Sequence, residues 1–207
     1  MSNAINLRLV NQSNDSSNSM YVIFQKNVAT NFEEVAVAWK VVRNLGIGDY
    51  HPFQYTYGLQ VSAGDSNGNF TPNMNAENGL MYQLVPNPSG HQLIQSGIAA
   101  GPSEIDLLNN LNRGAIDANC YRSGKLVATK TSLAPKQKAV FEFKPYIYIG
   151  VASQVEEGEI MNSAVVSNIN TEISLLGIVS ADIVITGGGP GTGSTEFKFT
   201  LQNVKYA

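Results

Sequence analysis

Apolar and polar residues alternate one by one through most of this chain of 207 residues. INLRLVN (5–11) has this pattern, and HPFQYTYGLQVSA (51–63) repeats it with aromatic residues. Side chains in a β-strand point to opposite faces in turn, so a period of two predicts strands buried on one side. About ten or eleven such segments follow one another, separated by turn signals such as Asn67-Gly68 and Ser123-Gly124. We therefore expect an all-β protein, an antiparallel β-sandwich of which a jelly roll is one variant.

Two stretches carry helix signals. SEIDLLNNLNRG (103–114) begins with a serine suited to an N-cap and ends at Gly114, which predicts one short helix there. TNFEEVAVAWKVVRNLG (30–46) has a capping box at Thr30 and Glu33, but valines alternate through its centre. Because β-branched residues favour strands, we interpret 30–46 as a strand, with a helix as the alternative.

The chain shows no linker, no shift in composition near its middle and no internal repeat. A length of 207 residues fits one large domain, so residues 1–207 are expected to form a single β-sandwich.

Only 14% of the residues are charged, and the net charge is −3. Nucleic-acid binders need clustered lysine and arginine, so that class of protein is excluded from our expectations. No apolar run is long enough for a transmembrane helix, and the N-terminus lacks the pattern of a secretory signal. With one cysteine the chain cannot form an internal disulfide. These features favour the cytoplasm, with non-classical release as the alternative.

Three segments resemble a group of small bacterial β-proteins of unassigned function: IFQKN (23–27), AVAWKVV (36–42) and FQYTYGLQV (53–61). In that group a Phe-Gln strand is followed by a strand ending in Ala-Trp and then by an alternating aromatic strand. The resemblance covers about the first third of the chain. It implies a β-sandwich and no particular activity.

GDSNG (64–68) fits the G-x-S-x-G pattern, and it resembles the first block of esterases whose nucleophilic serine lies in a Gly-Asp-Ser motif. The later Asp-x-x-His and Gly-x-Asn-Asp blocks of those esterases are absent. A strand, not a helix, is expected after Ser66. We therefore predict a β-hairpin turn at this position.

The same loop offers oxygen ligands for calcium at Asp65, Asn67 and Asn69. Its glycine does not fall at the sixth position that an EF-hand loop requires, and Asp65 is its only carboxylate. A solvated hairpin is the competing interpretation. The acidic segment VEEGE (155–159) is expected to be a solvated turn, and Cys120 a small buried apolar residue.

Trp39, Tyr55 and Tyr57 lie in an aromatic-rich part of the chain near Asn, Gln and Asp residues. Aromatic rings can cover the apolar face of a sugar while amides bind its hydroxyls. The same three residues are therefore candidates for glycan binding. The alternative is that they pack in the core and across strands.

Residues 187–193 hold five glycines and a proline. A phosphate-binding loop would need a lysine and a following helix, and this run has neither a lysine nor a helix pattern after it. We expect a hairpin loop that is mobile or ordered by a partner, with its contact residues at Gly187, Gly188, Gly189, Pro190 and Gly191.

These features together favour a non-enzymatic structural or interaction protein that associates with itself, without a cofactor. Few charges and many Asn, Ser and Thr residues suit surfaces that meet other protein surfaces. A glycan-binding module is the first alternative. A membrane-active, toxin-like β-sandwich is the second, based on the apolar segment TEISLLGIVSADIVIT (171–186).

Overall fold

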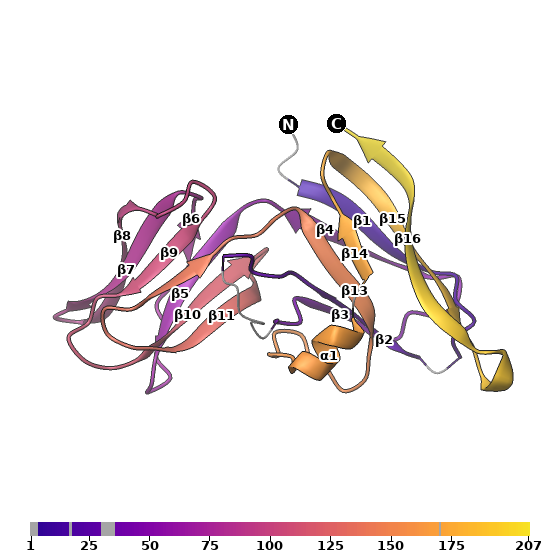
Figure 1. The fold of residues 1–207 in the computed structure, drawn as a ribbon, viewed down its shortest axis with the longest axis horizontal. Coiled ribbons are helices and arrows are strands. Elements are labelled where there is room, and N and C mark those ends of the chain that lie inside the picture. Colours follow the sequence, from indigo (N-terminus) through magenta and orange to yellow (C-terminus); the bar gives the residue numbers. More distant parts are fainter. Residues whose placement is uncertain (1–3, 17, 30–35, 170) are drawn as a thin grey trace. The chain divides into compact units, whose positions relative to one another are not determined.

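The computed structural model describes residues 4–16, 18–29, 36–169 and 171–207 (Figure 1). The expected all-β, sandwich-like fold is confirmed, because the strands form four sheets of four strands each. Most strand pairs are antiparallel, but β1 pairs with β15 and β7 pairs with β9 in parallel. The bounds of these four strands are Ala4–Asn11 for β1, Ile178–Gly188 for β15, Leu80–Asn87 for β7 and Ile105–Asn109 for β9.

The chain divides into two compact units. Unit 1 comprises Met1–Lys26, Val35–Tyr57 and Pro145–Ala207, and unit 2 comprises Asn27–Glu34 and Gly58–Lys144. Each unit holds two of the four sheets. That the two units form one domain over residues 1–207 stays a prediction.

The first sheet of unit 1 has the order β16-β15-β1-β4, and the second has the order β14-β13-β2-β3. The remaining bounds in this unit are Met20–Phe24 for β2, Lys40–Val42 for β3, Tyr50–Thr56 for β4, Tyr146–Ala152 for β13, Ser163–Asn168 for α1, Thr171–Ser174 for β14 and Thr195–Tyr206 for β16. A single 3₁₀ turn, Gly191–Gly193, precedes β16.

Aromatic rings fill the space between the two sheets of unit 1. Tyr21 on β2 meets Phe197 and Phe199 of β16 edge to face, with ring centroids 6.3 Å apart in both pairs. Edge-to-face pairs are a favourable geometry for buried rings. These contacts join the last strand of the chain to the second one.

The opposite face of β2 and β13 packs against helix α1 and neighbouring loops. Phe24, Ala38, Met161 and Ile169 belong to this second buried cluster. A Cβ at Gly150 would lie 3.0 Å from the Cα of Ile169, so glycine permits the close approach of the segment after α1.

The sheets of unit 2 have the orders β11-β10-β5-β6 and β12-β9-β7-β8. Their remaining bounds are Leu59–Asp65 for β5, Met74–Ala76 for β6, Gly90–Ile98 for β8, Ile116–Arg122 for β10, Lys125–Leu133 for β11 and Lys138–Phe141 for β12. The predicted turn at Ser123-Gly124 is confirmed between β10 and β11. Both residues have positive φ, as a two-residue type I′ hairpin requires.

The helix predicted at 103–114 is wrong, because this stretch contains strand β9. Ile105 and Leu107 are buried on one face, and β9 pairs with β7 on one side and β12 on the other. The carboxylate of Glu104 accepts a hydrogen bond from the backbone of Gly101, three residues before it. The capping signal therefore describes a turn before the strand, and pairing on both sides outweighs the local preference for a helix.

The strand interpretation of 30–46 is confirmed in its later part. Residues 30–35 lie outside the described residues. Val37 forms an isolated antiparallel bridge with Ile160, and Lys40–Val42 forms β3 beside β2.

Asn109 ends strand β9 and holds the loop that follows. Its amide donates hydrogen bonds to the carbonyls of Gly114 and Leu133, both at 2.9 Å, and its oxygen accepts one from the backbone N–H of Leu111. The side chain is fully buried. Water cannot replace the two buried bonds, to Leu133 and from Leu111, so the residue fixes where β9 stops.

Replacing Asn109 by leucine should lower the free energy of unfolding by about 2–4 kcal/mol, because the carbonyl of Leu133 and the N–H of Leu111 lose their partners in the interior. Chemical denaturation monitored by circular dichroism would measure this. Asn112→Leu on the exposed side of the same loop is the matched control and should change stability by less than about 0.5 kcal/mol. Equal losses of stability in both variants would contradict the role of the Asn109 hydrogen bonds in holding the loop.

Candidate functional site

The aromatic residues considered for glycan binding lie mostly in the core. Trp39 and Tyr55 are 0% and 2% exposed, and their rings pack edge to face at 6.1 Å. The hydroxyl of Tyr55 accepts a hydrogen bond from the side-chain amide of Gln25. Tyr57 is half-exposed and packs against Tyr55. Glycan binding through Trp39 and Tyr55 is therefore corrected to a packing role, because their rings offer no face to a sugar.

The GDSNG segment forms the hairpin turn that the sequence predicts. β5 ends at Asp65, and the backbone N–H of Gly68 donates to the carbonyl of Asp65. Gly68 has a φ of +82°, a conformation that glycine adopts without strain. Ser66 therefore occupies a hairpin turn, and the next element along the chain is strand β6.

The carboxylate of Asp65 is engaged by its own loop. It accepts hydrogen bonds from the backbone N–H groups of Asn67 and Asn69, at 2.8 and 3.0 Å. The side-chain amide of Asn69 donates to both carboxylate oxygens, at 3.3 and 3.0 Å. These bonds, above all those from Asn69, lower the pKa of Asp65 to about 2.

The calcium prediction at Asp65, Asn67 and Asn69 receives no support from this geometry. Asn67 and Asn69 turn N–H groups toward the carboxylate, whereas a calcium site needs several oxygens converging on one point. Within the described residues, no group of three or more His, Cys, Asp or Glu side chains is placed to hold a metal ion. The structure instead assigns Asp65 the role of ordering the hairpin.

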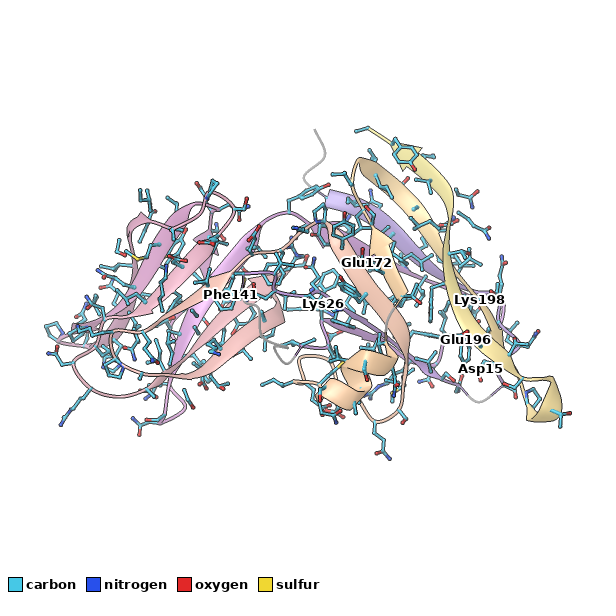
Figure 2. All side chains as sticks on the ribbon, viewed as in Figure 1. Asp15, Lys26, Phe141, Glu172, Glu196 and Lys198 are labelled. Carbon is cyan, nitrogen blue, oxygen red and sulfur yellow. The ribbon has the colours of Figure 1, made fainter. Side chains whose placement is uncertain are left out.

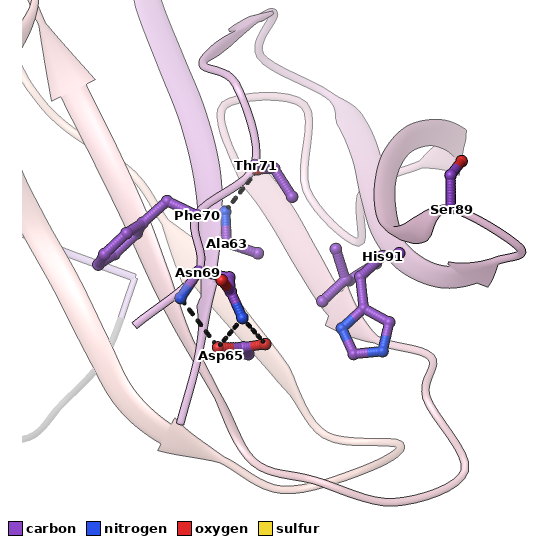
Figure 3. Close-up of a pocket in the computed structure, with 9 residues that line it drawn as sticks. Ala63, Asp65, Asn69, Phe70, Thr71, Ser89 and His91 are labelled. Carbon is purple, nitrogen blue, oxygen red and sulfur yellow. Dashed lines mark hydrogen bonds between the residues drawn. The ribbon is translucent and has the colours of Figure 1, made fainter. Parts of the chain in front are cut away.

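A pocket of about 410 Å³ opens beside this hairpin, inside unit 2 (Figure 3). Asp65, Asn69 and Thr71 approach it from the turn after β5, and His91 comes from the start of β8. Figure 3 shows the ring of Phe70 pointing away from His91. The complete lining is Ala63, Asp65, Asn69, Phe70, Thr71, Leu84, Ser89, Gly90 and His91. Sequence reasoning identified Asp65 and Asn69 but missed Thr71, which lies two residues further along the same loop, and His91, which joins them through the packing of two sheets.

The arrangement does not assemble a serine nucleophile with a base in this pocket. Ser66 does not line it, and Ser89 donates its hydroxyl to the side chain of Asn87. Asp65 accepts its hydrogen bonds from Asn67 and Asn69, and none joins it to the imidazole of His91 among the described residues.

Cys120 and the VEEGE segment have the roles that the sequence predicts. Cys120 is fully buried on β10, and burial raises the pKa of its thiol to about 12. The glutamates form a turn in which the backbone N–H of Glu159 donates to the carbonyl of Glu156. Glu156 and Glu159 are exposed, as a solvated turn requires.

The glycine-rich run is a hairpin connection, as predicted, between β15 and β16. A Cβ at Gly187 would lie 2.0 Å from the carbonyl oxygen of Glu196, and one at Gly188 would meet the ring of Phe197. The carbonyl of Gly187 accepts a hydrogen bond from the backbone of Asn14. Gly187–Gly189 are thus ordered by their own chain, while Pro190 and Gly191 are exposed at the tip. That this tip contacts a partner stays a prediction.

The long edge strands of the sheets differ in how well they are protected. A strand edge carries unpaired N–H and C=O groups, and charges, prolines and bulges keep it from pairing with other chains. β16 carries charged side chains, Glu196 and Lys198 among them (Figure 2), and its register with β15 shifts at three places. β11 contains lysines and two register shifts, and β4 contains Pro52.

β8 has none of these protections over most of its length. Gly90–Ile98 contains no Asp, Glu, Lys, Arg or Pro residue. Its register with β7 is unbroken from Gly90 to Gln95 and shifts only after that point. Among the described residues β8 pairs with β7 alone. The uncharged run HQLIQ (91–95) was the signal in the sequence, but its position at an edge could not be read from it.

The apolar segment proposed for membrane activity is built into β14 and β15. Ile173, Leu175, Ile178 and Ile183 are buried there, and Leu176 is the exposed residue at the turn. Across the described ranges, every helix is too short or too polar to cross a bilayer.

Comparison of the chain with protein-family models, curated proteins and solved structures finds no match.

The Asp65 hairpin should lose its order only in strong acid. Because the folded pKa lies below that of an unfolded aspartate, the carboxylate contributes stability above about pH 4, and this contribution is lost as the pH falls through about 2. The amide signals of Asn67 and Asn69 should shift in NMR spectra with a midpoint near that value. In Asp65→Asn, the same signals should not titrate there. A midpoint near pH 4 in the unaltered protein would contradict the hydrogen-bonded geometry.

The thiol of Cys120 should not react with Ellman's reagent in the folded protein at neutral pH, because it is buried and protonated. In denaturant one thiol per chain should react at once, which provides the internal control. Rapid labelling of the native protein would show that β10 is accessible or that the thiol is activated.

Proposed function

We propose that this protein is a non-enzymatic interaction protein that associates with further copies of itself through the edge of strand β8. The observation that carries the proposal is the unprotected run from Gly90 to Gln95, which lacks charged residues, prolines and register shifts. The free thiol of Cys120 suits a reducing compartment, and we propose the cytoplasm as the location.

A second copy of the same strand is a suitable partner for this edge. Two-fold pairing brings the same strand of each copy together, so a charged edge would place like charges opposite each other. β8 avoids this cost because it carries no acidic or basic residue apart from the imidazole of His91. Its backbone groups would join two four-stranded sheets into one continuous sheet.

The register with the longest regular overlap has its two-fold axis at Leu93. Gln92 then lies opposite Ile94 of the second copy, and His91 lies opposite Gln95. The pairing covers Gly90 to Ser96, where the register shift with β7 ends the regular run. Ile98, which is 81% exposed, would approach the β7–β8 turn of the second copy and lose contact with water.

Sedimentation velocity at micromolar protein concentration would test this association. The unaltered protein should form a dimer, and Gln92→Lys/Gln95→Lys should weaken it at least about tenfold, because like charges then line the shared edge. Both glutamines are exposed, so the variant should keep its fold, which circular dichroism would verify.

Thr200→Lys/Gln202→Lys provides the matched control. It adds the same charge on exposed positions of β16, the long edge that already carries bulges and lysines. This control should sediment as the unaltered protein does. A monomeric unaltered protein, or equal weakening by both variants, would rule out association through β8.

A further inference from the structure

The pocket between the β5–β6 turn and the start of β8 has the size and chemistry of a small-ligand site. Its volume of about 410 Å³ falls at the lower end of the range for small-molecule pockets. It lies wholly within unit 2. The hydrogen-bonding positions that remain open on its side chains determine which class of ligand fits.

Asp65 presents a fixed acceptor to the pocket. Three N–H groups of Asn67 and Asn69 hold its carboxylate in place, and only one of them reaches Oδ2. A carboxylate oxygen can accept two hydrogen bonds, and Oδ2 accepts only one from the described residues, which leaves one position for a ligand. A donor from a ligand would meet an oxygen that is already oriented.

Thr71 and His91 complement this acceptor. The hydroxyl oxygen of Thr71 accepts a hydrogen bond from the backbone of Ala63 at 3.0 Å, which leaves its hydrogen free to donate. The exposed imidazole of His91 makes no hydrogen bond within the described part of the chain. A neutral imidazole has one donor and one acceptor. Figure 3 shows Asp65 and His91 on facing sides of the pocket.

The charge and the lining restrict the ligand class. An anion would be repelled by the Asp65 carboxylate, and a cation would find only one free position on it. Each hydroxyl group of a sugar can both donate and accept a hydrogen bond. Adjacent hydroxyls on one ligand therefore match the Asp65 acceptor, the Thr71 donor and the His91 imidazole together. Ala63 and Leu84, the buried apolar residues of the lining, are 2% and 1% exposed, so the polar side chains carry the recognition.

We infer that this pocket binds a neutral sugar, with Asp65 accepting from one hydroxyl and Thr71 and His91 bonding others. The glycan site thus lies at this pocket instead of at the buried aromatic residues of unit 1. The inference does not rest on self-association, because the ligand would contact side chains and not the backbone edge of β8.

NMR titration of the ¹⁵N-labelled protein with single sugars tests the inference. The neutral probes are glucose, galactose, mannose, fucose and N-acetylglucosamine. Glucose 6-phosphate is the anionic comparison ligand, and agmatine is the cationic one. At least one neutral sugar should shift the imidazole signals of His91 and the amide signals of Asn69 and Thr71. The chain has two histidines, so His51 on β4 serves as the internal reference and should not move.

His91→Ala should weaken binding of that sugar about tenfold, because the ligand loses one side-chain partner. His51→Ala is the matched control and should leave the affinity unchanged. If no neutral sugar shifts the His91 signals, if only the anion or the cation does, or if His91→Ala binds the sugar with unchanged affinity, the inference is overturned. Sedimentation of the same samples distinguishes this outcome from a failure of self-association.

Discussion

Backbone groups at the edges of sheets are the constraint on which the rest of this structure depends. In the part of the chain that the structure describes, four separate sheets of four strands leave eight edge strands, each with N–H and C=O groups that no neighbouring strand satisfies. Four of these edges, β3, β6, β12 and β14, are only three or four residues long. The long edges need other protection, and the lysines of β11, Pro52 of β4 and the register shifts of β16 supply it. Among the described long edges, the neutral and regular edge of β8 is therefore the exception.

Local patterns predicted those parts of the fold that local geometry determines. Alternation identified strands such as β1 and β4, because a strand with one buried face repeats every two residues. Asn67-Gly68 and Ser123-Gly124 marked turns, because glycine supplies the positive φ that they require. The helix prediction for 103–114 failed because strand pairing, and not local geometry, determines the structure there. Its capping residues suit a helix, but Ile105 and Leu107 are placed by pairing with β7 and β12, which no local signal reveals.

The candidate sites also combine features that the local sequence predicts with features that depend on tertiary packing. The sequence presented Trp39 and Tyr55 as aromatic residues near amides, and the burial that decides their role comes from the packing of Trp39, just before β3, against Tyr55 on β4. It also presented Asp65 and Asn69 together, because their hydrogen bonds span only four residues. Thr71 lies in the same loop, two residues after Asn69, and His91 completes the pocket from β8 in the other sheet of unit 2. The position of His91 follows from how these two sheets pack, which could not be read from one sequence.

The glycine-rich run at 187–193 illustrates how one composition serves two purposes. Gly187 and Gly188 are needed because Glu196 and Phe197 leave no room for a Cβ, and the strand backbones approach closely there. Gly191 and Gly193 meet no such obstacle and lie in the exposed 3₁₀ turn at the tip. An alanine at 187 would therefore separate β15 from β16, whereas an alanine at 193 would meet no atom within 4 Å. Positive φ together with steric exclusion explains Gly187 and Gly188 at the base, and positive φ alone explains Gly191 at the tip, so a phosphate ligand is not required to account for either half.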